Sequence, residues 1–339
     1  MCKGFKMRHV PFLLKPAAKD YLWGGTRLND DFGKKLTVSP LAETWECSTH
    51  PDGLSLAMIP NGVTSDAVFL KDILNRNPKF LGTHSLSLTK GILELPILIK
   101  LIDADQNLSI QVHPDDEYAW KNEKSLGKTE MWYVLAAHKD SELIIGFNQD
   151  VTSDVIRNAV SLGNIEDYLN HVPVKKDDLF LIEAGKVHSI GKGILLAEIQ
   201  ENSNLTYRLY DYDRLDKQGR KRELHVEKAL DVVCMNSSKA PRQPMRLLKY
   251  KKGFATELLC RCKYFQVERM LLNTEINREM IDYRTASNSF HAFLCTEGCG
   301  MIFGDNYMLP FFMGDCIFVP AESEKLKLHG KAQLLDVSC

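Results

Sequence analysis

The sequence has no long hydrophobic run and no excess of charge of either sign. Its 43 Lys and Arg residues are balanced by 44 Asp and Glu residues, which gives a net charge of -1. A chain without a basic excess lacks the electrostatic footprint of a protein that binds nucleic acid or an anionic membrane. No stretch approaches the length of a spanning helix, and the N-terminus has no apolar run of signal-peptide length. We therefore expect neither nucleic acid nor a membrane as partner.

Paired cysteine motifs are also missing. The nine cysteines are scattered along the chain, and none belongs to a CxxC pair. An odd number of cysteines without a secretion signal predicts reduced thiols in a cytoplasmic protein. The pattern carries no signal for an oligomeric state.

What the sequence does contain is a series of short apolar stretches with the character of β-strands. They include "ILELPILIKLID", "EMWYVLAA", "ELIIGF" and "ILLAEIQ", and turn residues separate them. Many short strands with few helices predict a mainly β protein, a sandwich or barrel. A small helical insertion is expected near residues 152–172, where Ser153 and Asn164 are residues of the kind that cap helix N-termini.

The segment near residues 236–244 is rich in Ser and Pro and has no periodic pattern, which indicates a linker. Strand patterns resume after it. We therefore predict a first domain over residues 1–240, which contains the helical insertion, and a C-terminal β domain over residues 241–339.

Two segments of the chain resemble each other, "DDLFLIEAGKVHSIG" at 177–191 and "GDCIFVPAESEKLKL" at 314–328. Each has an acidic turn, an apolar strand and a second turn with Ala. This pattern resembles one of the motifs of the cupin jelly roll, in which a terminal His points inward to a metal. The first copy has His188 at that place and the second copy has no His. The resemblance implies a cupin jelly-roll domain and a second, degenerate cupin-like β domain without a metal site.

The stretch "LSIQVHP" places Ser109, Gln111 and His113 on one face of a strand that Pro114 ends. In "GKTEMWYV", the residues Lys128, Glu130 and Trp132 likewise share a face. A lone His on a strand is more often structural than a ligand. Together, two imidazoles, a carboxylate and an amide suit a catalytic zinc with one position left open. The ligand candidates are Gln111, His113, Glu130 and His188.

The chain is similar to the type I mannose-6-phosphate isomerases in their short bacterial form. The resemblance is carried by "LPILIKLIDADQNLSIQVHPDDEYA", "GKTEMWYV" and "AGKVHSIGKGILLAEIQENSNLTYRLYDYDR", with "YLWGG" and "AETWECSTHPDG" nearer the N-terminus. It covers nearly the whole chain and is loosest after residue 245. It implies a cytoplasmic enzyme with one Zn²⁺ per chain that interconverts mannose 6-phosphate and fructose 6-phosphate.

The resemblance also implies roles for individual residues. The metal ligands fall on Gln111, His113, Glu130 and His188, the active-site arginine on Arg208, and the residues at the substrate end of the pocket on Lys100, Ser109 and Lys128. The chain departs from the family pattern at Asn204, where many members have Asp. It also departs at Gly127, where longer members have a His.

Aldose–ketose isomerisation moves a proton between C1 and C2 through an enediol, and negative charge develops on oxygen. A divalent metal polarises the carbonyl, and a fixed cation such as Arg208 stabilises the developing charge. The residues leave the proton carrier open between Glu198, Asp211 and a metal-bound hydroxide.

Several alternatives stay open at this point. Lys100 interrupts an apolar strand, so it either binds an anionic substrate or forms an internal salt bridge with Glu130 or another carboxylate. Lys128 could be a solvated strand residue, and Trp45 could be a core residue. For the whole chain, the alternatives are another metal-dependent cupin enzyme and a non-catalytic sugar-phosphate-binding cupin.

Overall fold

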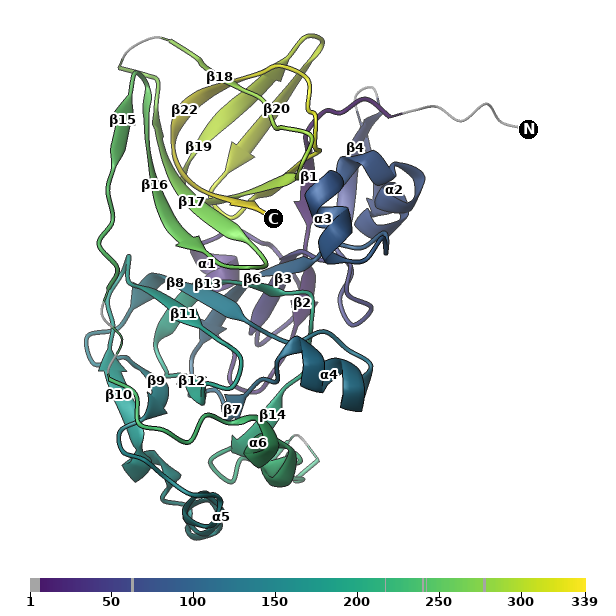
Figure 1. Cartoon of the computed structure of the whole chain (residues 1–339). Helices are drawn as coiled ribbons and strands as arrows, with labels where there is room; N and C mark the ends of the chain where they lie inside the picture. The colour runs from purple at the N-terminus through teal and green to yellow at the C-terminus, as the bar shows by residue number, and fades with distance from the viewer. Residues whose placement is uncertain (1–6, 62–63, 217, 240, 242, 277–278) are drawn as a thin grey trace.

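The computed structural model describes residues 7–61, 64–216, 218–239, 241, 243–276 and 279–339. Two β bodies lie one above the other in Figure 1, and helices α4, α5 and α6 lie at the lower body. The predicted mainly β architecture is confirmed. Most of the described elements are strands, and these strands pair in antiparallel sheets.

The lower body is a jelly-roll sandwich of two sheets. The six-stranded sheet has the order β11 (Leu179–Ile182), β8 (Glu130–Ala137), β13 (Ile194–Glu201), β6 (Ile97–Ala104), β3 (Glu43–Cys47) and β2 (Ala17–Lys19). The five-stranded sheet has the order β10 (Leu169–Pro173), β9 (Glu142–Phe147), β12 (His188–Ile190), β7 (Ile110–Val112) and β14 (Tyr207–Tyr210).

Apolar side chains from both sheets fill one part of the space between them. Trp132, Val134 and Phe180 from the six-stranded sheet pack in one cluster with Leu143 and Ile145 from the five-stranded sheet. Alternate residues of each strand face this space because side chains in a strand have a period of two. The same alternation turns the polar residues of β7 and β8 toward the other part of the interior, where the candidate site lies.

The upper body is an eleven-stranded sheet. Its main path runs β15 (Lys249–Lys251), β16 (Phe254–Arg261), β17 (Gln266–Asn273), β22 (Leu326–Ser338), β19 (His291–Gly304), β21 (Cys316–Val319), β1 (Phe12–Lys15), β4 (Leu56–Asn61) and β5 (Thr64–Phe69). Two further strands lie off this path: β18 (Ile281–Tyr283) pairs with β22, and β20 (Tyr307–Phe312) pairs with β19.

The sheets do not follow the predicted division at residue 240. Strand β1, from the N-terminal end of the chain, pairs with β21 on one side and with β4 on the other. Phe12 of β1 is buried and stacks on Phe318 of β21 with 5.3 Å between ring centroids. A division drawn along the sequence misses such a pairing because it joins segments from opposite ends of the chain. Residues 240 and 242, at the predicted linker, lie outside the described residues.

The helices are short. They are α1 (Arg27–Asp30), α2 (Leu70–Arg76), α3 (Thr83–Leu88), α4 (Asp116–Glu123), α5 (Ser153–Leu162) and α6 (Val226–Val232), with the 3-10 helices η1 (Pro78–Phe80) and η2 (Ile165–Tyr168). None of them, in the part of the chain that the structure describes, has the length and apolar character needed to cross a bilayer.

Helix α5 and η2 occupy the region where the sequence predicts a helical insertion. The N-cap of α5 is Thr152 rather than Ser153, because Thr152 has the extended backbone of a cap and its hydroxyl accepts a hydrogen bond from the Val155 N–H. Asn164 does precede η2, but its side chain makes no capping bond.

Candidate metal centre

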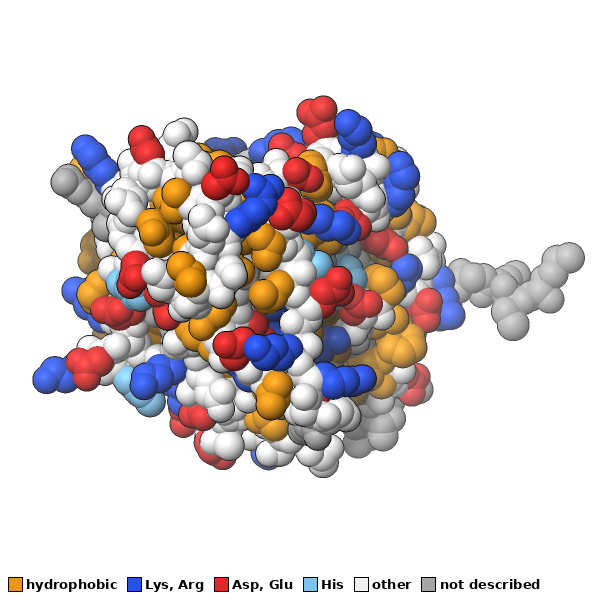
Figure 2. Space-filling view, turned by 90° about the horizontal axis from the view of Figure 1, so that it is seen from below, with side chains coloured by type: hydrophobic (Ala, Val, Ile, Leu, Met, Phe, Trp, Pro, Cys, Tyr) orange, Lys and Arg blue, Asp and Glu red, His pale blue; other side chains and the backbone are white. Residues whose placement is uncertain are grey.

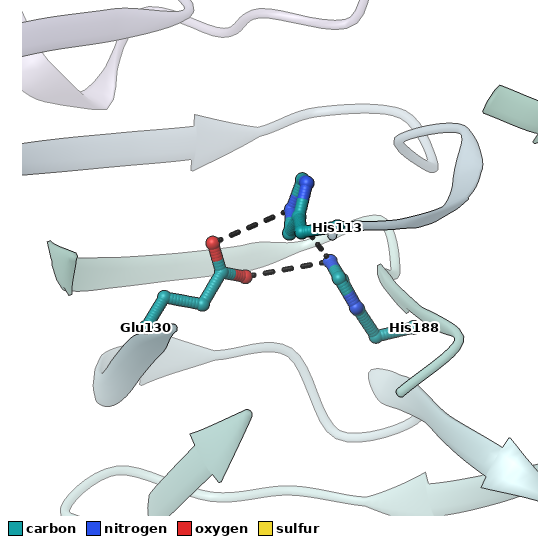
Figure 3. A group of neighbouring side chains, drawn as sticks. All are labelled: His113, Glu130 and His188. Carbon is teal, nitrogen blue, oxygen red and sulfur yellow. Dashed lines mark hydrogen bonds and ion pairs between the residues drawn. The ribbon is translucent and has the colours of Figure 1, made fainter. Parts of the chain in front are cut away.

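Three buried side chains converge inside the lower body: His113, Glu130 and His188. One possible ligand atom from each lies within 4.8 Å of the others (Figure 3). His113 directly follows β7, Glu130 begins β8 and His188 begins β12. The register of the five-stranded sheet brings β7 and β12 together, since His188 lies opposite Gln111.

The two imidazoles face each other through unprotonated nitrogens. Nδ1 of His113 donates to the carbonyl oxygen of Leu205 at 2.8 Å, and Nδ1 of His188 donates to that of Lys186 at 2.7 Å. With the protons on Nδ1, both Nε2 atoms carry lone pairs, and these atoms are 3.1 Å apart. Two lone pairs at this distance repel each other unless a cation lies between them. The backbone bonds to Nδ1 are also the partners that orient metal-binding imidazoles.

Glu130 completes the donor set. Its Oε2 lies 3.5 Å from Nε2 of His113 and its Oε1 lies 3.4 Å from Nε2 of His188. Neither oxygen accepts a well-aligned hydrogen bond, although Nζ of Lys128 is 3.1 Å from Oε2. A buried carboxylate with so few hydrogen bonds costs free energy that a bound cation would recover. The three residues thus fit a metal ion by their placement and by their unsatisfied atoms.

The electrostatics of the three side chains agree with this reading. Burial, together with the nearby Glu198 carboxylate, raises the pKa of Glu130 to about 7. Burial lowers the pKa of His188 to about 4, and burial with the Lys128 ammonium lowers that of His113 well below its ordinary value. Both imidazoles are therefore neutral at pH 7, which is the form that binds metal. Two imidazole nitrogens and one carboxylate are a donor set that zinc accepts, with a further position for substrate.

Gln111 lies at the edge of this group. Its Nε2 is 3.4 Å from Nε2 of His188, and its Oε1 accepts a hydrogen bond from the Ser109 hydroxyl at 3.1 Å. A half-turn of the amide would present the oxygen to the metal position and leave the hydroxyl of Ser109 as an acceptor. The alternation of β7 thus places Ser109, Gln111 and His113 together as the sequence predicts.

A cavity of about 220 Å³ lies beside this group. The residues named from the sequence that line it are Lys100, Ser109, Gln111, Lys128, Glu198, Asn204 and Arg208. Sequence reasoning did not identify four other residues of the wall, because the sequence has no motif for them outside the family pattern: Tyr21, Glu43, Thr206 and Arg222.

Lys100 forms the internal salt bridge that the sequence leaves open, and its partner is Glu198 rather than Glu130. Nζ of Lys100 is 3.0 Å from Oε1 of Glu198 and 3.7 Å from Oε2 of Glu43. Burial alone would lower the pKa of this ammonium, but the two carboxylates raise it above its ordinary value. Lys100 also lines the cavity, so pairing and substrate contact are compatible. Trp45, under this ammonium, is fully buried and is a core residue.

Glu198 is the ionised counterpart of Glu130. Burial would raise the pKa of Glu198, but Lys100 and Lys128 hold it at about 2, with hydrogen bonds from Lys100 and from Nε1 of Trp132 at 2.8 Å. Two neighbouring carboxyl groups whose pKa values are pushed apart are typical of sites with separate roles for each.

Arg208 has no carboxylate within salt-bridge distance among the described residues. Its Nη1 donates to the carbonyl oxygen of Glu223 at 2.7 Å, while its Nε is buried without a hydrogen-bond partner. Burial, followed by the charge of Arg222, lowers the pKa of Arg208 from its ordinary value. A guanidinium with this environment is prepared for a negative charge that arrives with a ligand.

The structure gives a reason for each departure from the family pattern. A Cβ atom on Gly127 would lie 2.5 Å from the backbone nitrogen of Asp116, where α4 begins, so no side chain fits there. Asn204 lines the cavity and donates from Nδ2 to Oδ2 of Asp52 at 2.8 Å. An aspartate at 204 would face that carboxylate with a like charge, so the amide suits this pair.

Comparison with known proteins agrees with the geometry. Residues 12–152 match the family model described as phosphomannose isomerase type I, catalytic domain. Mannose-6-phosphate isomerase ManA from Bacillus subtilis (strain 168) is 35% identical over 330 residues, which cover 97% of this chain and 99% of the relative. Mannose-6-phosphate isomerase from Streptococcus mutans is 31% identical over 325 residues, which cover 96% and 97%.

Solved structures give the same result. The crystal structure of mannose 6-phosphate isomerase from Bacillus subtilis matches with a TM-score of 0.84 at 30% identity, and covers 97% of this chain and 99% of that one. A mannose 6-phosphate isomerase structure described as holo and zinc bound matches with a TM-score of 0.73 at 16% identity, which is a likeness of fold.

The lone-pair geometry predicts that the purified protein carries one zinc ion per chain and that His188→Ala loses it. Elemental analysis after dialysis measures the metal. The control is His171→Ala, which removes an exposed imidazole paired with Glu142. Two zinc ions per chain, or full zinc retention in His188→Ala, would contradict this assignment.

The Lys100 pairing predicts that Lys100→Met lowers the free energy of unfolding of the zinc-loaded protein by about 3–5 kcal/mol, because it leaves two buried carboxylates without their cation. Chemical denaturation measures the change. Lys71→Met, which breaks a partly exposed pair with Glu94, should cost under about 1 kcal/mol. Equal effects of the two substitutions would show that the buried pair contributes no more than a surface pair.

Proposed function

Because the chain belongs to the type I mannose-6-phosphate isomerase family, we propose that it interconverts mannose 6-phosphate and fructose 6-phosphate with one zinc ion held by His113, Glu130 and His188. The observation that carries this proposal is the pair of neutral imidazoles whose lone pairs face each other beside a carboxylate. Gln111 is the proposed fourth ligand. The proposed location is the cytoplasm.

The chemistry divides between the metal and the chain's own residues. When bound, zinc polarises the substrate carbonyl and lowers the energy of the developing oxyanion. Ser109 and Lys128 line the cavity close to the donor group and are placed to hydrogen-bond hydroxyl groups of the sugar. Arg208 supplies a second fixed positive charge, and no carboxylate of the described residues has to leave its guanidinium when charge develops.

The position of Glu198 makes it the proposed proton carrier between C1 and C2. It lines the cavity and is ionised, with Lys100 bound to one oxygen and Trp132 to the other. Asp211, the other carboxylate left open by the sequence, does not line the cavity. Geometry is the first requirement for a general base, and it favours Glu198.

A coupled assay for mannose 6-phosphate isomerisation tests the function directly. We expect turnover by the purified protein, loss of turnover on zinc removal with a chelator, and recovery when zinc is added. Iron-dependent oxygen uptake in its place would indicate the alternative of another metal-dependent cupin enzyme. Sugar-phosphate binding without turnover in the zinc-loaded protein would indicate the non-catalytic alternative.

Arg208→Ala should lower kcat by roughly 10² or more, as the loss of a donor that acts in the transition state does, and should change KM much less. Steady-state kinetics on zinc-loaded protein separate the two constants. The control is Arg157→Ala, which removes an exposed guanidinium paired with Glu227. A raised KM with unchanged kcat would assign Arg208 to substrate binding and end its catalytic assignment.

A further inference from the structure

Arg222 is a cation of the cavity wall that sequence reasoning did not identify. It lies in the segment between β14 and α6, and its side chain is 29% exposed. It lines the catalytic cavity and also a neighbouring hollow of about 320 Å³, which Tyr21 borders as well. Arg222 therefore lies where the catalytic cavity meets the hollow.

A buried carboxylate fixes the direction of this guanidinium. Nε of Arg222 donates to Oδ2 of Asp211 at 2.7 Å and Nη2 donates to Oδ1 at 2.5 Å, a bidentate contact. No bond from its Nη1 group is present in the described part of the chain, so this group can donate to a ligand. Asp211 thus holds Arg222 in one orientation before any ligand binds.

The charges around Asp211 do not balance. Arg214 also pairs with Asp211, with Nη2 at 3.3 Å from Oδ1, and Arg208 lies close enough for Arg222 to lower its pKa. Two guanidiniums thus bind one carboxylate, and a third lies near them. Positive charge that is partly buried and not compensated costs free energy unless an anion binds. The lysines of the cavity differ in this respect, because Lys100 pairs with Glu198 and Lys128 pairs with Glu130.

The acidic residues decide on which side of Arg222 an anion binds. Two carboxylates, Asp20 and Asp216, border the neighbouring hollow beside Arg222, so a phosphate meets less positive charge there than in the catalytic cavity. On the catalytic side, four cations and two carboxylates line the wall, and positive charge still exceeds negative charge when Glu130, Asp211 and Arg214, which pair with wall residues, are counted. A phosphate monoester carries a charge close to -2 at pH 7, and this excess of positive charge favours its binding on the catalytic side.

We propose that Arg222 binds the phosphate group of the substrate and sets the preference for a phosphorylated over an unphosphorylated sugar, while Asp211 positions it. This inference rests on the proposed function and adds a residue to it. The sugar then spans the cavity, with C1 and C2 at the buried donors and the phosphate at Arg222. Arg208, which has no carboxylate partner among the described residues, lies opposite Gln111 in the pairing of β14 with β7, so we assign it to the reacting end and Arg222 to the phosphate.

The test compares Arg222→Gln with Arg220→Gln, which removes an exposed guanidinium of the same segment. For Arg222→Gln we expect KM for mannose 6-phosphate, and the inhibition constant of inorganic phosphate, to rise roughly 10- to 100-fold, the loss expected for a hydrogen bond between charged groups. We expect kcat to stay within about threefold, and turnover of unphosphorylated mannose, where measurable, to be unchanged. Arg220→Gln should match the unsubstituted protein in every constant.

A second variant tests whether Arg222→Gln acts only by disturbing the local structure. Arg222→Gln leaves Asp211 with Arg214 alone, so Asp211→Asn with Arg222→Gln removes both charges and should show the same rise in KM. Zinc content and thermal unfolding report whether each variant is folded. An unchanged inhibition constant for inorganic phosphate, or a fall in kcat without a change in KM, would overturn the assignment.

Failure of the proposed function would be visible separately. If the unsubstituted, zinc-loaded protein does not isomerise mannose 6-phosphate, the proposed function is wrong. The phosphate site is then tested by measuring phosphate binding without turnover. In that case inorganic phosphate should raise the melting temperature of the unsubstituted protein and of Arg220→Gln but not of Arg222→Gln. Equal protection of all three would show that Arg222 does not bind phosphate.

Discussion

The contact on which the site depends is the approach of two imidazoles whose unprotonated nitrogens are 3.1 Å apart. This geometry is unfavourable by itself, and the fold maintains it through backbone carbonyls that fix both Nδ1–H groups. The strands that carry the two rings are neighbours in one sheet, and the carboxylate comes from the facing sheet. The sandwich thus holds together atoms that repel one another until a cation binds, which is a form of preorganisation.

The charged side chains beyond the metal centre are also held in place before a ligand binds. Nearest the donors, each lysine has a carboxylate partner, so these ammonium groups are held in place and little net charge results. Around Asp211, the guanidiniums outnumber the carboxylates. A substrate with one reactive end and one anionic end meets a cavity whose charge balance changes along its length. The charge distribution of the wall therefore favours one orientation of the substrate.

The sequence predicts the inward residues well because strand alternation is local. Ser109, Gln111 and His113 follow from a period of two and a terminating proline, and β7 places all three at the site. The partner of Lys100 could not be predicted in this way, since Glu198 is brought opposite by the pairing of β6 with β13. Arg222 could not be predicted because it lies in a segment without regular structure, where neither periodicity nor spacing indicates where a side chain points.

The pairing of β1 with β21 has a consequence for how the chain reaches this structure. Phe12 and Phe318 are partners in one ladder although they come from the two ends of the chain. During synthesis β1 emerges long before β21, the strand that pairs with it. Until then, one edge of β1 has exposed N–H and C=O groups that another chain could bind. Such long-range pairing also slows folding, so the newly made chain passes through a period in which it is open to aggregation before the upper sheet closes.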